Sequence, residues 1–136
     1  MPQEVGRTSE ALESFRRIRG EMLVDLFYKH FLASGARIRS LFEKTNFTEQ
    51  KQMVRHGILM LLNYANGEAI SQLALRRLGH THHTRIGVSP DMYKSFVDCL
   101  IKAAAELDPL WSPRIERAWR ADLLAGIEVM KKYAAG

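Results

Sequence analysis

Histidines are the residues of this chain most suited to chemistry, and three of the five stand close together. His80, His82 and His83 fall in the segment LGHTHHTRIGV, at the end of a stretch with helical periodicity. A neutral imidazole nitrogen at such a helix end can bind a metal. Three kinds of chemistry therefore compete: histidines that cap a helix C-terminus, a zinc site, and a single axial bond to a haem iron.

The cysteine content argues against zinc. The single cysteine, Cys99, is remote from the histidines, and no second pair of ligands has the spacing typical of zinc sites. One cysteine also excludes an internal disulfide and is typical of a reducing compartment, so we expect a cytoplasmic protein. The first twenty residues carry charges throughout and lack the apolar core of a signal peptide. The longest run of large apolar residues, Ile58 to Leu62, is too short to span a bilayer.

Helical patterns supply the scaffold that such histidines need. Proline occurs only at positions 2, 90, 109 and 113, and no stretch shows the sustained two-residue alternation of a strand. We expect helices over about 8–19, 21–33, a stretch ending near 66, and 68–83, followed by two that begin at Pro90 and Pro113. The pattern predicts one all-α domain of six or seven helices over residues 1–136.

Helix ends and apolar faces follow from the same patterns. Cap candidates are Thr8 or Ser9 for the first helix, Thr45 or Thr48 for the long central one and Ser112 for the last, and Gly35 and Gly67 are natural stops. The inward-facing residues are expected to include the following: Ala11, Leu12, Phe15, Ile18, Leu23, Phe27, Phe31, Phe47, Val54, Ile58, Leu61, Phe96, Cys99, Leu100, Ala103, Leu107, Trp119, Leu123, Ile127 and Met130.

Four segments resemble the globin family, in particular bacterial single-domain globins and the globin part of flavohaemoglobins. HTRIGVSPDMY at 83–93 is similar to the family's proximal histidine and the start of its next helix. FYKHFL at 27–32 with RSLF at 39–42, and QKQMV at 50–54, are similar to the segments on the distal side. The similarity covers about residues 8–133. It implies a globin fold around a haem pocket, with haem b as the cofactor.

The resemblance assigns the axial ligand to one of two adjacent histidines. Counting back from Gly87-Val88 and Tyr93 gives His83 as the proximal ligand, whereas counting forward from Leu78-Gly79 gives His82. The two counts disagree by one residue because there is an insertion in this corner. We take His83 as the ligand and His82 as the alternative.

Other proximal residues follow from the same alignment of motifs. Tyr93 would lie beside the proximal histidine, with a purely packed aromatic as the alternative, and Val88 would contact the haem. Arg85 is a candidate partner for a haem propionate, or a solvated arginine. The family's late glutamate, which hydrogen-bonds the histidine, would fall near Ala134 here, and the nearest acid is Glu128. A strong proximal push on bound dioxygen is therefore not expected.

The distal residues implied by the resemblance are two donors and two apolar walls. Phe42 would pack flat on the porphyrin and Val54 would close the pocket. Tyr28 and Gln50 would donate hydrogen bonds to a bound ligand, with Gln52 as the alternative to Gln50. Each charge-assisted donor contributes about 1–3 kcal/mol, so the resemblance implies high oxygen affinity and slow release, with a smaller gain for carbon monoxide.

The functions implied by the resemblance are reversible dioxygen binding and, with an outside electron donor, nitric oxide dioxygenation or weak peroxidase activity. The chain has no G-x-G-x-x-G fingerprint of its own, so turnover would need a separate reductase. The alternative is a gas-sensing or haem-less globin-like module that acts through a partner protein. We expect a monomer or homodimer.

The positive charge of the chain fits an anionic cofactor better than a nucleic acid. The whole net charge of +5 comes from the segment between Arg37 and Lys94, which contains nine Lys or Arg residues and four Asp or Glu residues. No helix shows a continuous basic face with base-reading residues. We therefore expect no nucleic-acid and no membrane partner, and the propionates of a haem would offset part of this charge.

Overall fold

The computed structural model describes residues 9–67, 75–77 and 90–132, which are helical with short connections and contain no strand. The prediction of an all-α protein is confirmed. Of the helix expected over 68–83, the structure describes only residues 75–77, which are helical, and the rest of that expectation lies outside the described residues. The remaining helices are α1 (Glu10–Arg17), α2 (Gly20–Ala33), α3 (Ala36–Leu41), α4 (Phe47–Ala65), α6 (Pro90–Leu107) and α7 (Pro113–Lys132).

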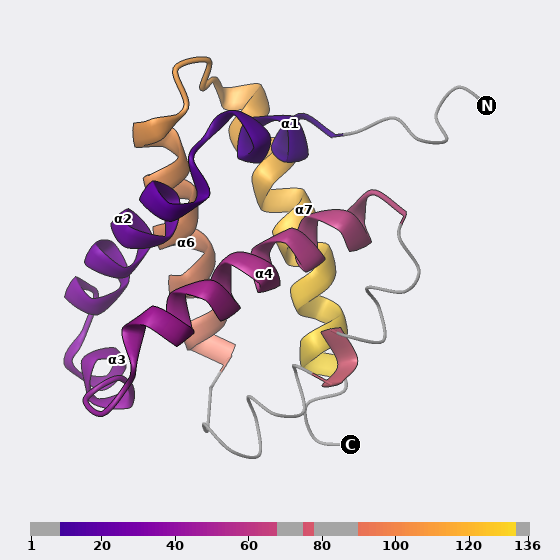
Figure 1. Cartoon of the computed structure of the whole chain (residues 1–136). Coiled ribbons are helices and arrows are strands. Elements are labelled where there is room, and N and C mark those ends of the chain that lie inside the picture. The colour runs from indigo at the N-terminus through magenta and orange to yellow at the C-terminus, as the bar shows by residue number, and fades with distance from the viewer. Residues whose placement is uncertain (1–8, 68–74, 78–89, 133–136) are drawn as a thin grey trace.

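The helices form a bundle in which α4 runs across the molecule and contacts α1, α2 and α7 (Figure 1). α2 packs mainly against α6, and α4 packs mainly against α7. α1 lies on α7, and the short α3 packs on α2. Gly126 of α7 permits the close approach of α4, because a Cβ atom at this position would overlap the side chain of Leu61. α2 and α4 are also in contact, and the candidate site described below lies between them.

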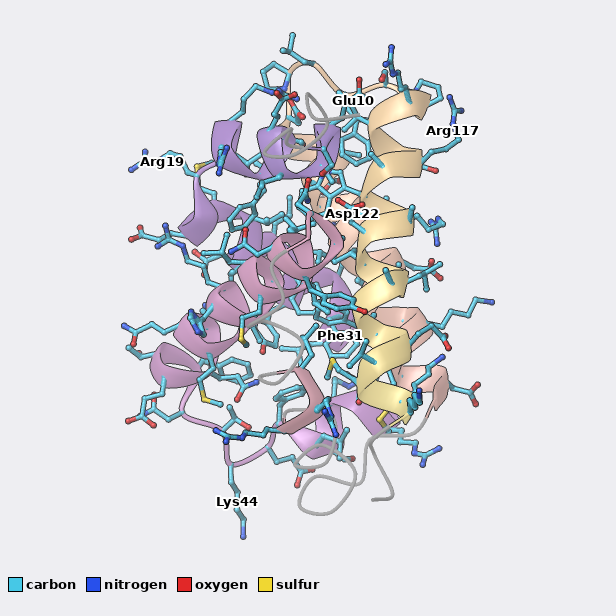
Figure 2. The ribbon with its side chains drawn as sticks, turned by 90° about the vertical axis from the view of Figure 1, so that its right-hand side faces the viewer. Glu10, Arg19, Phe31, Lys44, Arg117 and Asp122 are labelled. Carbon is cyan, nitrogen blue, oxygen red and sulfur yellow. The ribbon has the colours of Figure 1, made fainter. Side chains whose placement is uncertain are left out.

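The core is built from the apolar faces that the periodicity predicts, although Phe15, Phe47, Val54 and Leu107 lie half-buried at its edge. The structure also differs from the prediction in α6. Phe96 and Cys99 are only half-buried, whereas Val97, Ile101 and Ala104 on the same helix are buried. The reason is that α6 contacts both α2 and α7, so its buried surface is wider than a single stripe. In Figure 2 Phe31 points into the bundle, while Arg19, Lys44 and Arg117 project from its outside.

Side-chain caps fix the N-terminal ends of α1, α4 and α7. The Oγ of Ser9 accepts a hydrogen bond from Leu12 N at 3.1 Å, and the Oγ of Ser112 accepts one from Ile115 N at 3.2 Å. Both residues fulfil the capping role expected from the sequence. Gly67 follows the end of α4 with φ +94°, the left-handed region in which glycine is favoured. Gly35, by contrast, is extended, with φ 173°.

The prediction of Thr45 or Thr48 as the cap of the central helix is wrong. Asn46 is the cap, and its Oδ1 accepts hydrogen bonds from the backbone N–H of Thr48 at 3.1 Å and of Glu49 at 3.4 Å. Asparagine caps at least as well as threonine. With Asn46 as the cap, Phe47 is the first helical residue and packs against the core.

We expect Asn46→Ala to lower the free energy of unfolding by about 1 kcal/mol, because two backbone donors at the start of α4 lose their acceptor. Urea denaturation would measure the loss. Thr48→Ala is the matched control, since the exposed Thr48 contributes only its backbone to this cap. An equal loss in the two variants would contradict the assignment of Asn46.

A partly buried ion pair ties α1 to the connection between α6 and α7. Nη2 of Arg17 lies 2.7 Å from Oδ2 of Asp108, and Nε of Arg17 lies 3.1 Å from Oδ1. The side chain of Asp108 is fully buried. The Oγ of Ser14 also donates to Asp108, at 2.6 Å, and the backbone N–H of Leu110 donates at 2.9 Å. Every oxygen of this buried carboxylate therefore has donors.

None of the helices in the described part of the chain is long and apolar enough to cross a membrane.

Candidate ligand-binding site between α2 and α4

A tyrosine and a glutamine from two different helices meet between α2 and α4. Tyr28 belongs to α2 and is 3% exposed, so its hydroxyl needs a partner inside the protein. The polar group that acts on this hydroxyl is the side chain of Gln50 in the first turns of α4, whose hydrogen bonding opposes the rise in the pKa of Tyr28. The structure thus brings together the two donors that the sequence analysis selected.

The hydroxyl of Tyr28 stays protonated throughout the physiological range. Burial raises the pKa of Tyr28 to about 12, and the hydrogen bond with Gln50 offsets only part of this effect. A protonated phenol can donate to a ligand, whereas a phenolate would only accept. The site therefore offers a neutral donor whose charge does not change near pH 7.

Aromatic rings enclose the ring of Tyr28 on several sides. The ring centroids of Phe27, Phe42 and Phe47 lie 5.0, 5.6 and 5.4 Å from that of Tyr28. The interplanar angles are 65°, 79° and 81°, the edge-to-face arrangement that aromatic pairs favour. Phe42 follows α3 directly and is half-buried. The polar pair is thus set in an apolar wall.

The first turns of α4 decide which glutamine reaches this wall. Gln50 is half-buried and lies one turn before Val54, which packs against the core, so the two share a face. Gln52 is exposed to solvent. An ion pair between Lys51 Nζ and Asp25 Oδ1 at 2.8 Å joins α4 to α2 beside the pair. Gln50, rather than Gln52, is therefore the residue placed at Tyr28.

Tyr93 lies near the start of α6, away from this pair in the sequence. It is 9% exposed, and burial raises the pKa of its hydroxyl. The ammonium of Lys131 lies 6.0 Å from the centroid of its ring, within the range of a cation–π contact. Glu128 is 3.9 Å from Lys131. The ammonium over the ring of Tyr93 therefore belongs to a lysine that also pairs with Glu128.

The other four proximal candidates lie outside the described residues. These are His83, His82, Arg85 and Val88. Within the described ranges, no group of three or more His, Cys, Asp or Glu residues could hold a metal ion.

Two contacts at the site had no role in the sequence analysis. Phe47 was expected only as an inward-facing residue, although its spacing of three from Gln50 already puts both on one face of the helix. Lys131 was not singled out, and nothing in its local sequence signals a contact with a residue as distant as Tyr93.

Comparison with known proteins places the chain in a family. The family model described as Globin matches residues 25–125, which include Tyr28, Phe42, Gln50 and Tyr93. A crystal structure of a protein from Pseudomonas aeruginosa PAO1, described as structurally highly homologous to a human hemoglobin, superposes with a TM-score of 0.83 at 36% identity. The match covers 92% of this chain and 95% of that one. No curated protein matches the sequence.

The chain therefore belongs to the globin family, and it has the globin fold. Globins generally hold haem between their helices and bind dioxygen and other small gases.

Proposed function

We propose that this globin binds haem b and holds dioxygen reversibly, with Tyr28 and Gln50 as the hydrogen-bond donors to the gas. The observation that carries the proposal is the pairing of the buried Tyr28 with the half-buried Gln50 beside an aromatic wall. Membership of the globin family supports it. A haem bound through one histidine would supply a ferrous iron with an open coordination position for a diatomic gas.

The residues of this chain fit such a group. The two donors are neutral and the walls around Tyr28 are apolar, which suits an uncharged gas and a flat hydrophobic ring. In this proposal Phe42 and Val54 form the distal wall, and Val88 and Tyr93 lie on the proximal side. His83 is the axial ligand, with His82 as the alternative, and Arg85 pairs with a propionate.

The donors favour dioxygen over carbon monoxide. Dioxygen accepts hydrogen bonds strongly when it is held at the pocket, whereas carbon monoxide carries less negative charge. Each donor contributes about 1–3 kcal/mol when it is dry and charge-assisted. Because 1.4 kcal/mol corresponds to about tenfold, two donors together would slow oxygen release by roughly 10² or more.

Nitric oxide dioxygenation is a second use of the same pocket. Conversion of nitric oxide and dioxygen to nitrate consumes one electron in each turnover, and the sequence shows no dinucleotide-binding fingerprint that would deliver it. A separate reductase is therefore part of this proposal. Peroxidase activity should be weak, because the position of the late glutamate that would hydrogen-bond the proximal histidine falls near Ala134 in this sequence.

Absorption spectra of the ferric, ferrous and oxygenated protein test the proposal. We expect a Soret band from stoichiometric haem and a stable oxygenated form. His83→Ala should lose the haem or its normal ferrous spectrum, while His82→Ala, the matched control one residue away, should keep both. The opposite result would move the ligand to His82. A purified protein that cannot take up haem would contradict the proposal and favour a haem-less regulatory module.

A further inference from the structure

We propose that Phe47 is a positioning residue of this pocket, which holds the ring of Tyr28 so that its hydroxyl and the amide of Gln50 converge on one point. The inference rests on the proposed function and extends it to a residue that neither touches the gas nor belongs to the donor pair. It arises from the way in which one helical turn contacts one tyrosine twice.

The first contact is between aromatic rings. Phe47 is the first residue of α4, and its ring lies 5.4 Å from that of Tyr28 at 81°. It also lies 6.0 Å from the ring of Phe42, which is itself 5.6 Å from Tyr28. The rings of Phe42 and Phe47 therefore both pack edge-to-face with the ring of Tyr28 and restrict its rotation.

The second contact is the hydrogen bond from the same turn. Gln50 follows Phe47 by three residues, so both side chains leave the same face of α4. Phe47 meets the ring of Tyr28 while Gln50 bonds its hydroxyl. Because a hydrogen bond weakens steeply as its angle departs from linearity, a small tilt of the ring would loosen this bond and any bond to a ligand.

The turn itself is fixed independently of Phe47. Asn46 caps it, and the ion pair between Lys51 and Asp25 ties it to α2. Loss of the Phe47 ring should therefore leave the helix in place and remove one of the rings that restrict the rotation of Tyr28. Phe27 is a poorer probe than Phe47, because it is 1% exposed and its removal would open the core.

The test measures dissociation of oxygen and of carbon monoxide in Phe47→Ala. We expect oxygen to leave roughly three- to tenfold faster, as for one loosened hydrogen bond, and carbon monoxide to change less than about twofold. Phe47→Tyr retains the ring and should restore the wild-type rate. Phe47→Leu, which keeps most of the apolar volume but no ring, should resemble Phe47→Ala and serves if that variant is unstable.

Phe15→Ala is the matched control. Phe15 is also half-buried and makes an edge contact with one aromatic ring, that of Trp119, at 6.4 Å. This variant should lose comparable stability and keep the wild-type oxygen dissociation rate. If it accelerates oxygen release as much as Phe47→Ala does, the effect is general loosening and the proposal is wrong.

A readout that needs no haem separates this inference from the proposed function. Ultraviolet titration of each purified chain, minus its Tyr28→Phe counterpart, gives the ionisation of Tyr28 alone. We expect the pKa of Tyr28, about 12 in the wild type, to fall toward 10 in Phe47→Ala as the ring gains access to water. An unchanged ionisation would overturn the role of Phe47. Absence of a Soret band in every variant would instead contradict the proposed function, and the titration would still decide on Phe47.

Discussion

Replacing Tyr28 by Phe should accelerate oxygen dissociation by roughly 5- to 150-fold, the range that corresponds to losing one charge-assisted hydrogen bond of about 1–3 kcal/mol. The substitution removes only the hydroxyl, and the ring keeps its contacts with Phe42 and Phe47. Carbon monoxide should leave at nearly the wild-type rate. Stopped-flow or flash-photolysis kinetics on both ligands would measure the difference.

The pH dependence sharpens this prediction. Because burial raises the pKa of Tyr28 to about 12, its hydroxyl keeps the donor proton, and oxygen release from the wild type should stay slow up to about pH 10. Tyr64→Phe is the matched control, since Tyr64 is half-buried on α4 and packs against the core. Equal oxygen rates in the wild type and Tyr28→Phe would show that Tyr28 does not face the ligand.

Local sequence signals predicted those parts of the fold that depend on local chemistry. Ser112 followed by Pro113 marks the start of α7, and Ser9 marks the start of α1, because a hydroxyl cap bonds the backbone three residues on. The start of α4 was less determined, because T-N-F-T offers three residues that can cap. The structure uses Asn46, which places Phe47 inside the first turn. That choice depends on packing against Tyr28, which lies on another helix and outside any local window.

The candidate site likewise divides into features that the sequence predicts and features that depend on tertiary packing. Tyr28 and Gln50 were selected through resemblance to globins, since helical periodicity alone puts Tyr28 off the face that carries Phe27 and Phe31. In the structure Tyr28 is nevertheless buried, because α2 packs against α6 on one face and against α4 on another. The choice of Gln50 over Gln52 follows from the register of α4 against α2, as does the contact of Phe47. The approach of Lys131 to Tyr93 joins α7 to α6 and is likewise a tertiary effect.

Replacing Arg17 by Met should destabilise the protein by roughly 2–4 kcal/mol at pH 7. The carboxylate of Asp108 is fully buried, and removal of its cation leaves a charge inside the protein. The value lies below that of a wholly buried pair because the Arg17 side chain is 31% exposed and water partly screens it. Arg114→Met is the matched control: its pair with Glu10, at 2.9 Å, lies on the surface, and its loss should cost less than about 1 kcal/mol.

The effect of pH on this variant has a definite sign. Burial alone would raise the pKa of Asp108, but the hydrogen bonds from Arg17, Ser14 and the Leu110 backbone outweigh it and hold the pKa below its usual range. The pair therefore stabilises the wild type above about pH 4, and this stabilisation is lost as the pH falls through the lowered native pKa.

Without Arg17 only two neutral donors oppose burial, so the native pKa of Asp108 should rise above the unfolded value. Stability of Arg17→Met should then increase as the pH falls through that raised pKa, while stability of the wild type decreases. The gap between the two chains, measured by urea denaturation from pH 7 to pH 3, should therefore narrow. A gap of constant size would mean that Arg17 stabilises the corner by packing its stem rather than by neutralising Asp108.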